Sequence, residues 1–165
     1  MDLRFDFIGP INDENFLALR NFIVSQEEKP SSLIININSL GGAVPSGIGI
    51  YNFLKQMPFH ITTRNMGEVS SSAILLYLAG NTRIAEPVSK FVIHPISMGI
   101  NGDLPYYQVQ EILRGIEADI NNFKKIVNQE TLCLARKYDV EQFLKSDSLI
   151  LDVHAAYELG IVTNV

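Results

Sequence analysis

The sequence has little of what marks a disulfide-bonded, membrane-spanning or metal-binding protein. Its single cysteine, Cys133, cannot form an internal disulfide, and its three histidines have no cysteine or carboxylate at ligand spacing. No apolar run approaches the roughly 18 residues that cross a bilayer. Residues 1–6 also lack the pattern that begins a signal peptide. These absences predict a cytoplasmic protein with no metal site and no cofactor of its own.

Positive charge is scarce as well. The chain has 13 Lys and Arg against 18 Asp and Glu, a formal net charge of −5, and its basic residues form no dense cluster. Nucleic acid and membrane are therefore both rejected as partners, because each attracts a concentration of positive charge. The 165 residues, 47% of them hydrophobic, are enough for one compact domain with a sizeable core, and we expect a single domain over 1–165.

Apolar periodicity predicts strands that alternate with helices. The expected strands cover 5–8, 33–38, 60–65, 83–85, 90–94 and 161–162, and the expected shorter helices lie near 12–23, 48–54, 71–78 and 155–159. Residues 33–38 are almost continuously apolar or β-branched, which is typical of a strand covered on both faces. Alternation of this kind implies an α/β fold with right-handed crossovers and a largely parallel sheet.

One predicted helix is unusually long. From Leu104 to about Tyr138, apolar residues recur every three or four positions. At 1.5 Å per residue, about 30 helical residues would span roughly 45 Å, more than the diameter of a small domain. We therefore expect part of this helix to project and to expose an apolar stripe that favours self-association. The alternative is a helix that folds back on its own sheet or breaks near Gly115.

Three serines and a histidine suggest nucleophilic catalysis. Ser70, Ser71 and Ser72 stand where a polar strand end becomes an apolar helix, so helical N–H groups would lie beside a hydroxyl. His94 ends a later strand and could act as general base. The alternative is that the serines only cap a helix and that His94 is an ordinary hydrogen-bonded residue at a strand end.

A pair of glycines could complete such a site. Gly41 and Gly42 follow a buried strand, and without Cβ atoms their backbone can approach a ligand and direct N–H groups at it. Glycine pairs are more often ordinary turns.

Together and in order, five segments resemble the Clp peptidase family, the proteolytic subunit of ATP-dependent Clp proteases within the crotonase-like superfamily. The resemblance covers nearly the whole chain from Phe5 onward. It implies a spiral of β-β-α units with a long projecting helix, and a serine endopeptidase. The segments are 37–42, 47–51, 67–80, 92–95 and 156–162.

The resemblance also assigns roles to individual residues. Gly67 and Gly80 bracket Ser71 at the family's spacing, which implies that Ser71 is the nucleophile. His94 corresponds to the general base. The N–H groups of Gly42 and Ser72 correspond to the oxyanion hole, although the family usually has methionine where Ser72 stands. The side chains of Ser70 and Ser72 are interpreted as capping or packing groups.

The third member of the triad departs from the family. Its aspartate position falls on Ser148, so we assign the role to the neighbouring Asp147, which a one-residue loop shift would bring to His94. Asp152 is a more distant alternative, because it is expected to cap a helix. Without an orienting aspartate, catalysis slows by roughly 10⁴-fold.

Assembly and partners are likewise implied by the resemblance. We expect a peptide or unfolded protein as substrate, and a homo-oligomer of heptameric rings, possibly stacked in pairs, around a chamber. ATP would enter only through a separate AAA+ unfoldase. Two departures bear on this: Leu40 replaces the proline usual before the glycine pair, and the N-terminal axial segment is short or absent. Coupling to an unfoldase is therefore left open.

Two other functions remain alternatives. Ser148 at the aspartate position is compatible with a catalytically weak or inactive structural subunit. An acyl-CoA enzyme of the crotonase superfamily would share the fold and an oxyanion hole, but typically uses carboxylates where this chain has Ser71 and His94.

Overall fold

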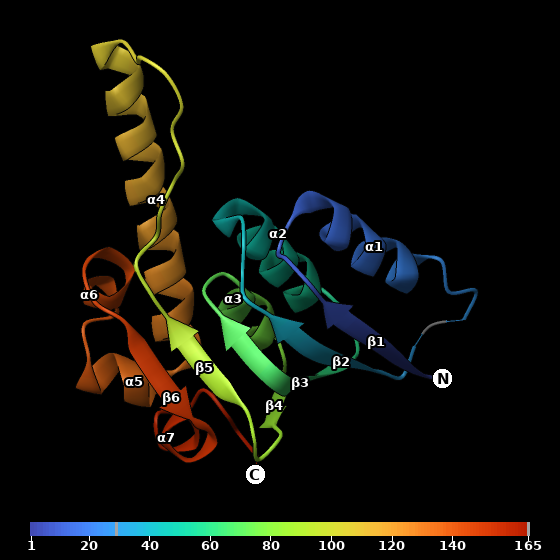
Figure 1. Ribbon diagram of the computed structural model, residues 1–165. Helices are drawn as coiled ribbons and strands as arrows, with labels where there is room; N and C mark the ends of the chain where they lie inside the picture. The colour runs from blue at the N-terminus through green and yellow to red at the C-terminus, as the bar shows by residue number, and fades with distance from the viewer. Residues whose placement is uncertain (29, 165) are drawn as a thin grey trace.

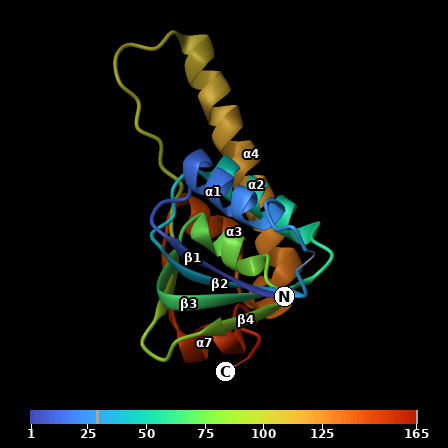
Figure 2. The same cartoon turned by 90° about the vertical axis from the view of Figure 1, so that its right-hand side faces the viewer.

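The computed structural model describes residues 1–28 and 30–164. In this part of the chain six strands form one sheet, with helices packed against it (Figures 1 and 2). The strands are β1 (Asp2–Ile8), β2 (Ser32–Ser39), β3 (His60–Ser70), β4 (Thr82–Ala85), β5 (Lys90–Ile93) and β6 (Leu149–Asp152). The helices are α1 (Asp13–Val24), α2 (Val44–Lys55), α3 (Ala73–Leu78), α4 (Tyr106–Glu130), α5 (Leu132–Lys137), α6 (Val140–Lys145) and α7 (Val153–Glu158).

The sheet is parallel except at one edge, as the alternating pattern predicts. Its main order is β1-β2-β3-β5-β6, and only the pairing of β5 with β6 is antiparallel. The long strand β3 pairs with β4 through Thr62–Asn65 and with β5 through Glu68–Ser70. The part of β3 that runs on past β4 therefore carries the first of the three serines to the end of β5.

The core lies between the sheet and the helices. Every residue of α3 is buried, so this short helix is central rather than amphipathic. In β2, Leu33, Ile35 and Ile37 are fully buried while the alternate residues are partly or fully exposed. The cover predicted for both faces of this strand is uneven: one face of β2 carries the core and the other is only partly covered.

The long helix projects, but it ends earlier than predicted. Helix α4 stops at Glu130, and the Thr131 hydroxyl hydrogen-bonds to the carbonyl of Val127 as the chain turns into the separate helix α5. Gly115 lies inside α4 and does not break it. The buried residues of α4 belong to its C-terminal half, and the N-terminal half extends away from the sheet (Figures 1 and 2). Large apolar side chains are exposed on that half, namely Tyr106, Tyr107, Val109 and Leu113.

The C-terminal segment also differs from prediction. Residues 161–162 form no strand, because the N–H groups of Ile161 and Val162 both bond to the carbonyl of Ala156 and close the end of α7. Gly160, with a φ of +76°, makes that turn possible. Helix α6 and strand β6 were not predicted. None of the helices described here combines the length and the apolar composition needed to cross a bilayer.

Candidate active site

A strained turn presents the second of the three serines. Ser71 lies between the end of β3 and the start of α3, and its φ of +55° makes it the one non-glycine residue with positive φ in the described chain. A non-glycine residue in this region costs energy and is concentrated at functional sites. The same strand-turn-helix geometry exposes the nucleophile of α/β-hydrolases. The backbone thus singles out Ser71 from its neighbours.

The turn is fixed to the strand that carries the histidine. The Ser71 N–H donates a 2.8 Å hydrogen bond to the carbonyl of Val92, which lies two residues before His94. Ser70 pairs with Val92 in the same ladder. These contacts hold the serine and the histidine, which are distant in sequence, at the same end of the sheet.

The glycine pair packs directly on this turn. Gly41 has a φ of +94°, and an ideal Cβ on it would lie 3.1 Å from the nitrogen of Ser72. The loop is held from its other side by Ile11, which donates to the Gly41 carbonyl and accepts from the Ala43 N–H. Leu40 is exposed and the loop is still formed, so proline is not required for this geometry.

Two backbone donors remain free at this point. Gly42 forms a parallel β-bridge with Ile11. In this bridge Ile11 bonds to the residues on either side, Gly41 and Ala43, so the N–H of Gly42 itself is unused. Within the described residues, the N–H groups of Gly42 and Ser72 donate to no protein acceptor. Gly42 is exposed and Ser72 stands at the start of α3, so neither N–H needs an acceptor within the chain and both are donors available to a ligand. A pair of them beside Ser71 is what an oxyanion hole requires.

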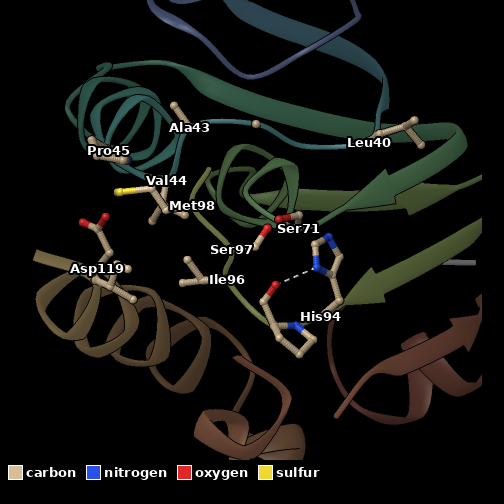
Figure 3. A pocket seen from close by; sticks show the side chains of 13 residues that line it. Leu40, Ala43, Val44, Pro45, Ser71, His94, Ile96, Ser97, Met98 and Asp119 are labelled. Atoms are coloured by element: carbon tan, nitrogen blue, oxygen red, sulfur yellow. Dashed lines mark hydrogen bonds between the residues drawn. The ribbon is translucent and has the colours of Figure 1, made fainter. Parts of the chain in front are cut away.

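The histidine is oriented by the main chain. The Nδ1 atom of His94 lies 2.9 Å from the carbonyl oxygen of Pro95 (Figure 3). A carbonyl oxygen can only accept, so Nδ1 carries a proton, and in the neutral imidazole Nε2 has the lone pair. His94 is therefore held in a tautomer in which Nε2 can act as a base.

These groups line one pocket. Its volume is about 390 Å³, within the usual range for a ligand site. Figure 3 shows Ser71 and His94 together, with Asp119 of α4 farther along the pocket. The lining residues are Leu40, Gly42, Ala43, Val44, Pro45, Ser71, His94, Pro95, Ile96, Ser97, Met98, Ile116 and Asp119. The predicted Ser71, His94 and Gly42 therefore meet here, and Ser72 follows directly.

The other predicted side chains lie elsewhere. Asp147 is exposed, does not line the pocket, and accepts a 2.7 Å hydrogen bond from the N–H of Ser148. Because Ile93 pairs with Leu149 in the antiparallel ladder, continuing that register places Ser148 opposite His94. Asp152 caps α7 through the N–H of Ala155, as predicted. None of these contacts joins Asp147 to the imidazole, and its triad role stays a prediction.

The neighbouring serines were interpreted as capping or packing groups, and the structure shows packing. Ser72 is the residue before α3, but its hydroxyl is buried and has no hydrogen-bond partner among the described residues. It packs toward Gly47 of α2, where an added Cβ would lie 3.2 Å from the Ser72 Cβ. Ser70 is buried at the end of β3. Both side chains are therefore packing groups.

Two pocket groups had no assigned role in the sequence. The Pro95 carbonyl is a backbone group, which no residue type reveals. Asp119 could have been noticed, since it stands three residues after Ile116 on an otherwise apolar helical face. Burial raises the pKa of its carboxyl above the ordinary value.

The chain is similar to known proteins in sequence and in fold. The family model described as Clp protease matches residues 8–165. Among solved structures, a mutant of ClpP1 from Listeria monocytogenes superposes with a TM-score of 0.78 at 22% sequence identity, covering 97% of this chain and 88% of that one. At this identity the structural match shows a shared fold, the Clp-like fold.

Proposed function

We propose that this chain, which belongs to the Clp protease family, is a serine peptidase subunit that hydrolyses unfolded or short peptides. The observation that carries the proposal is the meeting of Ser71 and His94 in one pocket beside two free backbone donors. Capping alone would not account for the positive φ of Ser71.

The chemistry follows from the tautomer of His94. Nε2 takes the proton of the Ser71 hydroxyl as the hydroxyl oxygen attacks the peptide carbonyl, and the Gly42 and Ser72 N–H groups donate hydrogen bonds to the developing oxyanion. The imidazolium then gives that proton to the leaving amine. Water hydrolyses the acyl-enzyme by the reverse sequence and restores the hydroxyl.

The orienting group for His94 has two candidates. The Pro95 carbonyl already accepts from Nδ1 and would stabilise the imidazolium through a neutral dipole. Asp147 remains the predicted carboxylate, but it would have to exchange its bond to the Ser148 N–H for one to the imidazole. A carboxylate stabilises the imidazolium more strongly than a carbonyl does, so the choice sets the rate.

Assembly is part of the same proposal. Tyr106, Tyr107 and Leu113 expose apolar surface on the projecting half of α4, which supports a homo-oligomer in which these helices interlock. We propose heptameric rings, possibly stacked in pairs, whose chamber admits only short or unfolded chains. The substrate would add as an extended strand beside the Gly41 loop. An AAA+ unfoldase is the proposed source of any ATP dependence.

Labelling with a fluorophosphonate probe tests the nucleophile. The assembled protein should be labelled at Ser71, and Ser71→Ala or His94→Ala should remove labelling and peptide hydrolysis. Ser70→Ala is the matched control and should leave both intact, because Ser70 does not line the pocket. Light scattering on the same sample reports assembly, and a monomer at micromolar concentration would contradict the proposed rings.

A second function is a catalytically silent structural subunit. It is favoured by the position of Asp147, which is exposed and bonded to its own neighbour. An assembled oligomer that neither reacts with the probe nor cleaves peptides would establish it. Hydration of an enoyl-CoA by the purified protein would instead favour the acyl-CoA alternative.

A further inference from the structure

The active-site pocket holds a carboxylate that the proposed reaction does not use. Asp119 projects from α4 into the pocket, on the side away from His94 (Figure 3). It stands one helical turn after Ile116, which lines the same pocket. Helix α4 therefore contributes both an apolar and an acidic group to the wall that faces the nucleophile.

Asp119 has no partner of opposite charge. Among the residues that the structure describes it forms no ion pair and no side-chain hydrogen bond, and neither lysine nor arginine lines the pocket. His94 is the one other titratable side chain in the lining. Because Asp119 is only partly buried, water solvates its charge in the free pocket, and a cationic group of a ligand could pair with it there.

The walls between Ser71 and Asp119 are mostly apolar. Val44 and Pro45 come from α2, Ile96 and Met98 from the segment after β5, and Ile116 from α4. Lysine and arginine have the matching character, because their aliphatic stems pack on apolar surface while the charged head reaches a polar group.

We propose that Asp119 determines substrate specificity by binding a lysine or arginine side chain of the residue whose carbonyl Ser71 attacks. The inference rests on the proposed function. With the carbonyl at Ser71 and its oxygen on the Gly42 and Ser72 N–H groups, the side chain of that residue enters the pocket toward α4. An apolar side chain would bury Asp119 without a partner, and an acidic one would be repelled.

Matched fluorogenic peptides test this directly. Peptides that differ only at the residue before the cleaved bond, with lysine, norleucine, glutamine or glutamate there, are compared by kcat/KM. The kcat/KM of the lysine peptide should exceed that of the norleucine peptide by about ten- to a hundredfold, which is the effect expected of one charged hydrogen bond in a pocket. Glutamine as the best substrate would overturn charge recognition.

Variants separate the role of Asp119 from general damage. Asp119→Asn should bring the lysine-to-norleucine ratio close to one, and Asp119→Lys should make glutamate the preferred residue. Glu111→Gln is the control, since Glu111 is an exposed acid on the same helix and does not line the pocket. An unchanged ratio in Asp119→Asn would overturn the inference.

Two further measurements separate this inference from the proposed function. Probe labelling of Ser71 in all Asp119 variants, with no lysine preference, would leave the peptidase intact and remove the specificity role. If no labelling occurs at all, binding of the lysine and norleucine peptides to Ser71→Ala by fluorescence anisotropy still tests Asp119. Equal binding of the two peptides would then overturn the inference without any turnover.

Discussion

An ideal Cβ on Gly41 would lie 2.6 Å from the Cβ of Ser71 and 2.7 Å from the carbonyl oxygen of Ser70. Real side chains do not approach so closely, so the loop after β2 and the turn after β3 fit together only because residue 41 is glycine. The free donor on Gly42 and the hydroxyl of Ser71 are consequently positioned by one contact between two segments.

Gly41→Ala should therefore damage the site and the fold together. The added Cβ would overlap the Ser71 Cβ and the Ser70 carbonyl oxygen, and φ is +94°, so we expect a loss of about 1–3 kcal/mol in the free energy of unfolding and loss of probe labelling at Ser71. Urea unfolding and labelling measure the two effects. The control is Gly115→Ala, where the helix leaves open space and alanine should stabilise by about 0.5–1 kcal/mol.

Arg83→Met should strongly destabilise the protein. Arg83 is buried, pairs with Glu130 at 3.6 Å, and donates to the carbonyls of Gly160 and Ile161. Removing one partner of a buried pair typically costs about 3–5 kcal/mol, and denaturant unfolding measures it. The double variant Arg83→Met with Glu130→Gln should lose less than the sum of the two single losses; strict additivity would show that the pair is not coupled.

Two variants at neighbouring positions test whether a carboxylate orients His94. We expect Asp147→Asn to lower kcat/KM by less than about tenfold, because the imidazole is already held by the Pro95 carbonyl, whereas loss of a true triad aspartate costs roughly 10⁴-fold. Ser148→Asp should raise kcat/KM, since the strand register places residue 148 opposite His94. A loss near 10⁴ in Asp147→Asn would instead establish the predicted Ser-His-Asp triad.

The Glu141 ion pairs should make stability depend on pH. Hydrogen bonds from Lys124 at 2.8 Å and Lys145 at 2.6 Å lower the pKa of Glu141 from 4.5 to about 2. A lowered carboxyl pKa contributes stability that is complete above pH 4.5 and is lost as the pH falls toward 2. Glu141→Gln should thus be less stable than the parent at pH 7 in low salt, with the difference disappearing near pH 2. A difference that stays constant across this range would contradict the assignment.

The parts of the fold that sequence reasoning predicted are those set by local pattern. Alternating apolar segments located β1 to β5 and the helices between them, and the three- to four-residue spacing found α4. The end of α4 was missed because neither glycine nor proline marks it in the sequence, and the contacts of Thr131 there are made only in the folded chain. Strand β6 was missed because its pairing with β5 is a tertiary contact between segments far apart in the chain.

The candidate site was likewise predicted from the sequence only in part. Ser71, His94 and Gly42 could be proposed from motif order, since glycine, serine and histidine are residue types that this chemistry demands. The unused N–H groups, the Pro95 carbonyl on His94 and the entry of Asp119 into the pocket depend on where the backbone runs in space. No residue type specifies such contacts.

By itself, the sequence determined a mostly parallel α/β chain with a projecting amphipathic helix, because these follow from the spacing of apolar residues. It also determined the serine, the histidine and the glycine loop of the candidate site, because these follow from side-chain chemistry. Only the tertiary structure decided the tautomer of His94, the strained backbone of Ser71 and the position of Asp119 in the same pocket. Each of these depends on contacts between segments far apart in the chain, and such contacts form only when the strands pair and the helices pack.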